Sequence, residues 1–195
     1  MTVRVIGDDG SELAKAYQGE LPSNDYFEKD VSEIFGFSQP RVVGSIIVTV
    51  DKPGVIGDVI IGELQSLRYA SSLSLQGRLF KEAIFSQVAN TPYLFTGLAL
   101  MNPQGEAADV TIEVFSSYGE ATGQASFKLP GGHRLSKLLF DLVPETRNQV
   151  EGYFVVRSSQ PLAGQQIFGD YRQTFFAAVP PNIQGPYTRG VVQEK

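Results

Sequence analysis

The sequence contains no cysteine and no tryptophan, and only one histidine. Without cysteine the chain can form no disulfide, no thiolate nucleophile and no cysteine-based zinc site. His133 is the only residue on which a Ser-His-Asp triad could be built, and no G-x-S-x-G motif accompanies it. Charged residues are also scarce, at 19%. We therefore expect a protein that is not an enzyme, with no catalytic residues, no metal site and no cofactor.

Basic clusters and long apolar runs are missing as well. The formal net charge is −5, whereas nucleic-acid binding needs clustered lysine and arginine to displace counterions from phosphates. No apolar run approaches the roughly 18 residues of a membrane-spanning helix. The first residues, MTVRVIGDDG, do not have the pattern of a signal peptide. We expect no nucleic-acid partner, no membrane span and no leader peptide within this chain.

Glycine and proline, in contrast, are frequent, with 20 and 11 residues. They separate short segments in which apolar and polar residues alternate, such as 2–6 and 95–101. Alternation with a period of two is typical of half-buried β-strands, and glycine and proline are typical of the turns between them. No long helical pattern lies between these segments. The sequence therefore predicts an all-β protein with antiparallel sheets.

The second half of the chain repeats the pattern of the first. TVRVI at 2–6 resembles TIEVF at 111–115, displaced by 109 positions (111 − 2). VGSIIV at 43–48 resembles EGYFVV at 151–156, displaced by 108 (151 − 43), and IIGE at 60–63 resembles IFGD at 167–170, displaced by 107 (167 − 60). Similar blocks in the same order, with one-residue slips at turns, indicate an internal duplication.

We predict two tandem antiparallel β-sandwich units of the immunoglobulin-like kind, each with a short helix. The first, copy one, would occupy residues 1–90 and the second, copy two, residues 91–195, with the junction at residues 89–92. Helices are expected at 27–35 and 135–143, where apolar residues follow a helical spacing. Copy one lacks a counterpart of the strand at 95–101, so its first strand is missing and its sheet has an open edge.

An open sheet edge invites pairing with another strand. We expect the segment 187–195, or the same segment of a neighbouring chain, to help cover copy one. Self-association through sheet edges is therefore one predicted interaction, and contact with neighbouring modules of the same protein is another.

Copy two carries a distinctive pattern: TG and NP flanking an aliphatic strand at 96–103, LPGG at 129–132, and SSQPLAGQQIFGD at 158–170. It resembles a β-sandwich repeat of large secreted bacterial proteins. The resemblance implies an extracellular or cell-surface module without catalytic activity, and no defined activity comes with it. Copy one follows the pattern weakly and departs from it at Lys52-Pro53-Gly54, where the QPL of copy two is lost.

The remaining candidates for chemistry have plainer explanations. His133 lies in a glycine-rich turn and is expected to be an exposed turn residue. Asp8-Asp9-Gly10 could hold calcium, but the spacing of a calcium loop is absent and a hairpin turn is favoured. Asp58 with Glu63 could act as an acid–base pair. Because Glu63 and Asp170 recur at one position in the two copies, a structural role such as turn capping is favoured for both.

Aromatic residues are plentiful, with 13 phenylalanines and 8 tyrosines. Most align with apolar residues of the other copy and are expected in the core. Tyr118 and Phe175 align with polar residues, and together with Tyr171 they are weak candidates for a ligand-binding platform that stacks on sugar rings. Sugar-stacking modules usually use tryptophan, which is absent here.

Three functions follow from these observations. The favoured one is a non-catalytic structural or adhesive module, or an interaction module, of a larger exported bacterial protein. The first alternative is a carbohydrate-binding module that recognises polysaccharide through the aromatics of copy two. The second alternative is a self-associating subunit linked by strand exchange.

Overall fold

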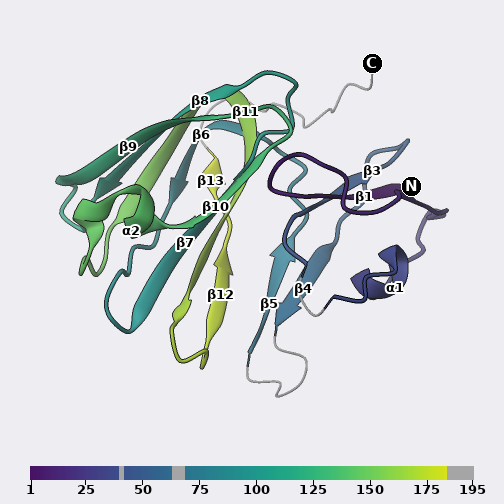
Figure 1. The fold of residues 1–195 in the computed structure, drawn as a ribbon, viewed down its shortest axis with the longest axis horizontal. Coiled ribbons are helices and arrows are strands. Elements are labelled where there is room, and N and C mark those ends of the chain that lie inside the picture. Colours follow the sequence, from purple (N-terminus) through teal and green to yellow (C-terminus); the bar gives the residue numbers. More distant parts are fainter. Residues whose placement is uncertain (40–41, 63–68, 184–195) are drawn as a thin grey trace. The chain divides into compact units, whose positions relative to one another are not determined.

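The computed structural model describes residues 1–39, 42–62 and 69–183 of the chain. Contacts between Cα atoms divide the chain into two compact units, residues 1–55 and residues 56–195 (Figure 1). Antiparallel strands dominate both units, and the two helices are short. The fold is therefore all-β and antiparallel, as the sequence predicted.

The first unit is built on a three-stranded antiparallel sheet with the order β2-β1-β3. β1 spans Thr2–Ile6, β2 spans Tyr17–Gln18 and β3 spans Ser45–Thr49. The alternating sequence of β1 explains its central place, because Val3 and Val5 are buried while Arg4 on the opposite face is only partly covered.

The helix of this unit, α1, spans Val31–Phe35. The carboxylate of Asp30 caps its first turn by accepting a hydrogen bond from the backbone nitrogen of Ser32 at 2.7 Å. The helix ends at Gly36, whose φ of +68° lies in the left-handed region that glycine adopts without strain. The predicted end is confirmed, but the helix begins at Val31 rather than at residue 27, because Asp30 is its capping residue.

The second unit contains the remaining described elements. Its strands are β4 (Asp58–Gly62), β5 (Ala70–Ser74), β6 (Phe80–Phe85), β7 (Leu94–Met101), β8 (Ala108–Phe115), β9 (Ala121–Leu129), β10 (Arg134–Leu138), β11 (Tyr153–Asp170), β12 (Phe176–Val179) and β13 (Asn182–Ile183). Between β10 and β11 lie the short helix α2 (Leu139–Leu142) and a 3-10 turn, η1 (Pro144–Thr146).

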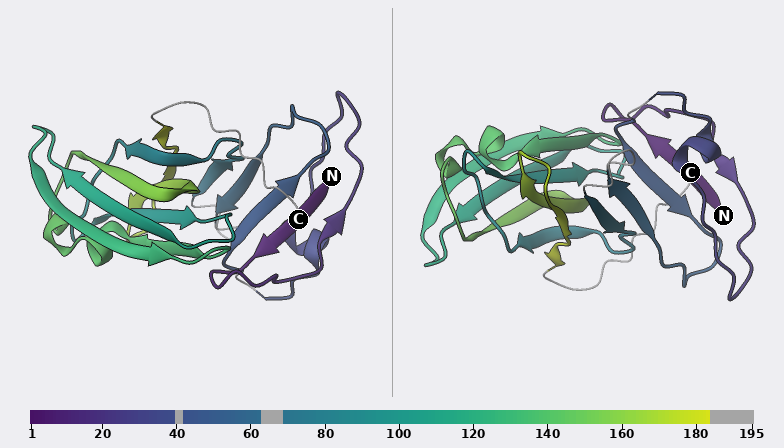
Figure 2. Two further views of the ribbon diagram at one scale, coloured as in Figure 1. Left: turned by 90° about the horizontal axis from the view of Figure 1, so that it is seen from above. Right: turned by 90° about the horizontal axis from the view of Figure 1, so that it is seen from below.

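The long strand β11 organises this unit. Its first half lies between β8 and β6, and its second half lies between β7 and β12. The pairing with β6 shifts register between Arg157 and Leu162, where β11 passes from one set of neighbours to the other. In both views of Figure 2 the teal and green strands of this unit curve around its interior. Phe80, Leu100 and Ile112 come from different strands and fill one common core.

Residues 89–92, predicted as the junction of two domains, lie inside the second unit. Ala89 and Asn90 are almost fully buried. The side-chain amide of Asn90 donates to the hydroxyl of Thr146 at 3.0 Å, and its oxygen accepts from the backbone nitrogen of Thr96 at 3.2 Å. The chain therefore divides after residue 55 and not after residue 90, because β6 and the residues that follow it supply core and pairing to the second unit.

Residues 134–138 form strand β10, whereas the sequence predicted that a helix begins at residue 135. β10 pairs with β7, with Leu138 opposite Gly97. Helix α2 follows at once, and its first residue, Leu139, is fully buried. The presence of β7 as a pairing partner decides the structure of this segment, since the same apolar spacing suits a short helix or a strand.

Segments that align in the sequence also pair in the same register. β1 and β3 place Thr2 opposite Thr49, and β8 and β11 place Thr111 opposite Arg157. The displacements are 109 for the first residues (111 − 2) and 108 for the second (157 − 49), which are those of the sequence alignment. β2 lies beside β1 as β9 lies beside β8.

The turns that connect aligned strands agree as well. Gly10 follows β1 with a φ of +79°, and Gly119 follows β8 with a φ of +83°. Gly44 and Gly152 precede the next aligned strands. At each of these two glycines a Cβ atom would overlap the carbonyl oxygen at the end of the neighbouring strand, β1 or β8, so only glycine fits.

The aligned halves differ where copy one has no counterpart of β7. In copy two, β7 pairs with β10 on one edge and with β11 on the other. Residues 26–30, which align with β10, form no strand. β4 and β5 form a separate two-stranded hairpin. Residues 26–30 have no strand like β7 beside them, so their backbone groups gain no hydrogen bonds between strands. The described part of copy one therefore has no equivalent of β10, and none of the pairing between β11 and β7.

Candidate functional site

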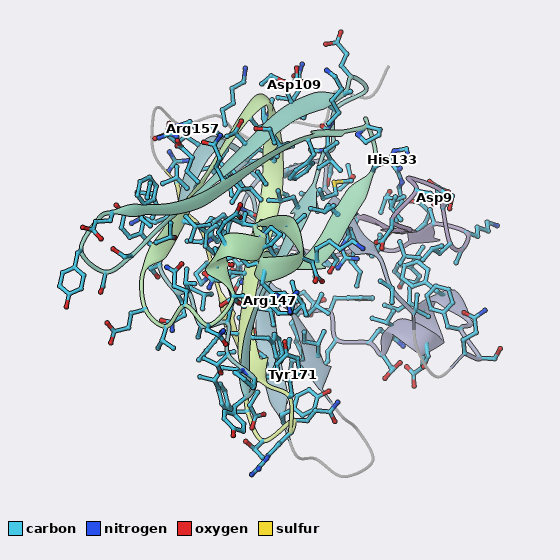
Figure 3. All side chains as sticks on the ribbon, turned by 60° about the vertical axis from the view of Figure 1, so that its left-hand side comes forward. Asp9, Asp109, His133, Arg147, Arg157 and Tyr171 are labelled. Carbon is cyan, nitrogen blue, oxygen red and sulfur yellow. The ribbon has the colours of Figure 1, made fainter. Side chains whose placement is uncertain are left out.

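An aromatic hollow lies at the turn between β11 and β12. It has a volume of about 170 Å³ and is lined by Tyr69, Phe95, Asp170, Tyr171, Gln173, Phe175 and Phe176. Figure 3 shows Tyr171 well away from Arg157 and His133 on the same unit. Most of the lining residues are aromatic, so this hollow, referred to below as the aromatic hollow, suits a flat and partly apolar ligand better than an ion.

Asp170 shapes the turn that carries the hollow. Its carboxylate accepts hydrogen bonds from the hydroxyl of Thr174 at 2.5 Å and from the backbone nitrogen of Thr174 at 2.7 Å. These bonds to Thr174, the hydroxyl bond first, lower the pKa of the Asp170 carboxyl. The contacts are those of a turn cap, which agrees with the structural role predicted for Asp170. Glu63, its aligned residue, lies outside the described residues.

Two partly exposed rings flank the turn, and each packs on a second ring. Tyr171 is 48% exposed, and its centroid lies 5.4 Å from that of Phe95. Phe175 is 38% exposed, and its centroid lies 5.2 Å from that of Phe168. Burial, together with the negative charge of Asp141, raises the pKa of the Tyr171 hydroxyl. Tyr171 therefore has a partly open ring surface, held against the ring of Phe95.

Tyr118 lies elsewhere, in the turn between β8 and β9. Its side chain is 91% exposed, and its backbone nitrogen donates to the hydroxyl of Ser116 at 3.2 Å. Of the three residues predicted to form one platform, the structure brings Tyr171 and Phe175 to the same hollow and places Tyr118 in a different turn.

The sequence did not single out three rings of the hollow: Tyr69, Phe95 and Phe176. Tyr69 and Phe176 align with each other and were expected in the core, and Phe95 lies in the strand that has no counterpart in copy one. The one sequence signal related to Phe95 is the glycine at position 169, which lies opposite Phe95 in the β7–β11 pairing. A Cβ atom on Gly169 would stand 2.9 Å from the Phe95 ring, so that glycine leaves room for the ring to turn toward Tyr171.

The other candidates bond within their own turns or hairpins. His133 is half-buried, and its Nδ1 lies 2.9 Å from the backbone carbonyl oxygen two residues earlier. The carboxylate of Asp9 accepts from the backbone nitrogen and the hydroxyl of Ser11 at 3.0 and 2.6 Å, and that of Asp58 accepts from the hydroxyl of Ser74 at 2.6 Å. Within residues 1–39, 42–62 and 69–183, no three potential metal ligands gather at one place.

Comparison with known proteins gives no assignment. No known protein family and no curated protein matches this sequence. The Anabaena sensory rhodopsin transducer is similar in structure, at 16% sequence identity and a TM-score of 0.39. The similar region covers 47% of this chain and 99% of that one. A similarity at this level carries no argument about function.

Among the described helices, none is long and apolar enough to cross a bilayer.

Proposed function

We propose that this chain is a non-catalytic structural and interaction module of a larger exported bacterial protein, in which consecutive copies of one β-unit share strands. The observation that carries the proposal is the place of β6. In the sequence, Phe80–Phe85 belongs to copy one, yet β6 pairs with β11 of copy two. A strand that completes the sheet of the following copy joins the two copies through backbone hydrogen bonds, which suits a structural spacer.

The duplication is supported by the agreement between aligned segments. Two unrelated sheets would have no reason to share displacements of 109 and 108 in their pairing. The aligned glycines Gly44 and Gly152 meet the same steric restriction, and Gly10 and Gly119 adopt the same backbone conformation. Register, turns and sterics are separate observations, and all three follow from one unit used twice.

β6 is built into the core and not laid on its surface. Phe85 is fully buried, and its ring stacks on that of Phe154 in β11 with centroids 4.9 Å apart. On the outer face Arg157 of β11 contacts Glu82 of β6 at 3.0 Å and also contacts Glu113 of β8. Such exposed ion pairs contribute only about 0–1 kcal/mol each. These ion pairs link three neighbouring strands, while the buried phenylalanines supply more of the stability.

Export and a cell-surface location are proposed from the pattern in copy two that resembles repeats of large secreted bacterial proteins. Two residues of that pattern, Thr96 and Asn102, are fully buried. The side-chain amide of Asn102 donates to the backbone oxygens of Glu106 at 2.8 Å and Leu129 at 3.1 Å. The pattern therefore serves the fold, which agrees with a module that has no catalytic role.

Sedimentation with insoluble polysaccharide tests this function. The purified chain is mixed with cellulose or chitin, and the fraction that pellets is measured against a non-binding control protein. A structural module is expected to stay in the supernatant, like the control. Saturable pelleting would contradict the proposal.

Carbohydrate binding at the aromatic hollow is the second candidate, favoured by the open ring surfaces of Tyr171 and Phe175. It predicts pelleting that Tyr171→Ala or Phe175→Ala abolishes. Tyr118→Ala is the matched control, because Tyr118 is an exposed tyrosine in a different turn. Pelleting that all three variants retain would exclude the hollow as the binding site.

Self-association by strand exchange is a third candidate, and it concerns the segment 187–195, which lies outside the described residues. Light scattering of the whole chain and of a chain ending at residue 186 tests it, because this shorter chain keeps β13, which pairs with β6. A change in molecular mass or in thermal stability on shortening is expected if this segment helps to cover copy one, and unchanged behaviour would contradict it.

A further inference from the structure

Among the residues that the structure describes, no strand pairs with one edge of the β4–β5 hairpin, whereas the aligned edge in copy two is paired. Within the described residues β4 pairs with β5 alone. The aligned stretch, residues 165–169 of β11, pairs with β12 on one edge and with β7 on the other. Gly62 and Gly169 hold the same place in the two hairpins. At each, a Cβ atom would press on the backbone oxygen of the residue that leads into the return strand.

The open edge carries apolar surface. Ile60 in the middle of β4 is 77% exposed, and Ile56, just before the strand, is 92% exposed. Ile167, which aligns with Ile60 (167 − 60 = 107), lies opposite Gly97 of β7 and is half-buried. Natural proteins usually protect an open edge with charged residues. Strand side chains point to the faces of the sheet, so the greater exposure of Ile60 is that of a residue flanked by a described strand on one side only, whereas Ile167 is flanked on both sides.

The other side of the hairpin joins the layer that contains β7. The backbone nitrogen of Ala178 in β12 donates to the hydroxyl of Ser71 in β5 at 3.0 Å, and the ring centroids of Tyr69 and Phe176 lie 5.7 Å apart. Both contacts join aligned residues, because 178 − 71 and 176 − 69 are both 107. Contact between equivalent residues is what a local two-fold axis produces. The same axis places a strand like β7 on the free edge of β4.

We propose that the free edge of β4 binds an extended polypeptide strand with the pattern of β7, supplied by a neighbouring module. The proposal rests on the proposed function, because it treats copy one and copy two as repeats. In copy two, β7 is antiparallel to β11, and we transfer this pairing to β4 by subtracting 107 from the residue numbers of β11. The result places a leucine opposite Val59, a glycine opposite Ile60 and a threonine opposite Ile61.

Backbone hydrogen bonds and alternate side chains together recognise such a strand. In copy two the alternate leucines of β7, Leu98 and Leu100, are each 1% exposed, so they supply apolar burial along one face. A strand that keeps these two leucines offers the same burial to copy one. A strand that loses them retains only the backbone bonds, which give little net free energy in water.

The probe is a fluorescent peptide with the sequence of residues 93–103, YLFTGLALMNP, extended by lysines for solubility. Mixed with the full chain, it is expected to show saturable fluorescence anisotropy with a Kd on the order of 1–100 µM. A peptide in which serine replaces the leucines at positions 98 and 100 is the matched control, and its affinity is expected to be lower by about tenfold or more.

The protein variant Ile60→Lys places a lysine in the edge strand, and lysine is a residue by which natural proteins discourage pairing at an open edge. Because Ile60 is 77% exposed, the variant is expected to fold like the parent. Its affinity for the peptide is expected to be lower by about tenfold or more. Tyr118→Lys is the control, since it adds the same charge in the turn between β8 and β9 and leaves β4 unchanged. Amide hydrogen exchange is expected to slow in residues 58–62 when the peptide is bound.

Absence of saturable binding would overturn the proposal. Equal binding to the parent and to Ile60→Lys would also overturn it. So would slower exchange that is confined to amides outside β4. These results are independent of the sedimentation with polysaccharide. A failed peptide experiment and a failed structural role are therefore distinguishable.

Discussion

Phe85→Ala is the substitution that most directly probes the role of β6. Phe85 is fully buried, stacked on Phe154 at 4.9 Å and edge-on to Phe80 at 6.1 Å. Truncation of a buried phenylalanine removes its transfer free energy and leaves a cavity, for a typical loss of about 3–5 kcal/mol. In a unit of this size, a loss of 1 kcal/mol lowers the melting temperature by roughly 4 °C, so a decrease of roughly 12–20 °C is expected.

Urea unfolding followed by circular dichroism and tyrosine fluorescence measures the loss of stability. Phe85→Leu keeps most of the apolar volume and is expected to lose about 1–2 kcal/mol. Tyr118→Ala removes an aromatic ring that is 91% exposed, and is expected to change the free energy of unfolding by less than about 0.5 kcal/mol. A loss below about 1 kcal/mol for Phe85→Ala would refute the reasoning, because Phe85 would then contribute little packing to the core of the second unit.

Three further predictions concern single residues. Gly152→Ala, at a φ of +114° and against a backbone oxygen, is expected to cost about 2 kcal/mol or more in urea unfolding, whereas Gly105→Ala, with open space around it, is expected to stay within about 0.5 kcal/mol. The pKa of Asp170 is lowered on folding, so the stabilisation of its turn is fully present above the unfolded pKa of about 3.9 and is lost as the pH falls through the lower folded pKa. The amide resonance of Thr174 is expected to titrate with a midpoint below 3.9, and a midpoint at or above it would contradict the hydrogen bonding. Asn102→Ala leaves the backbone oxygens of Glu106 and Leu129 without their donor and is expected to cost about 1–3 kcal/mol in the same unfolding experiment; unchanged stability would show that water replaces the amide.

Local chemistry was readable from the sequence where it alone decides the structure. The alternation around Val3 and Val5 predicted β1, and Gly36 predicted the end of α1, because a buried face and a left-handed residue are short-range requirements. Tyr171 and Phe175 were predicted to lie on one surface with Tyr118. Tyr171 and Phe175 line one hollow because they flank the same turn, which Asp170 closes.

Long-range pairing was not readable from local patterns. Residues 135–138 have an apolar spacing that suits a helix, and they form β10 only because β7 lies beside them. The domain boundary was misplaced for a similar reason. A strand such as β6 has the same alternation whichever sheet it joins, so the sequence of Phe80–Phe85 does not reveal that its partner is β11 of the following copy.

Two shortened chains, residues 76–195 and 91–195, give the most direct test of strand sharing. The longer chain keeps β6 and also Gln76, whose side-chain oxygen accepts from the backbone nitrogen of Gly164 at 2.9 Å. We expect it to unfold cooperatively in urea. The shorter chain exposes one edge of β11 and the ring of Phe154, and we expect it to lose cooperative unfolding. If residues 91–195 alone unfold with the cooperativity and midpoint of the whole chain, the two copies do not share β6.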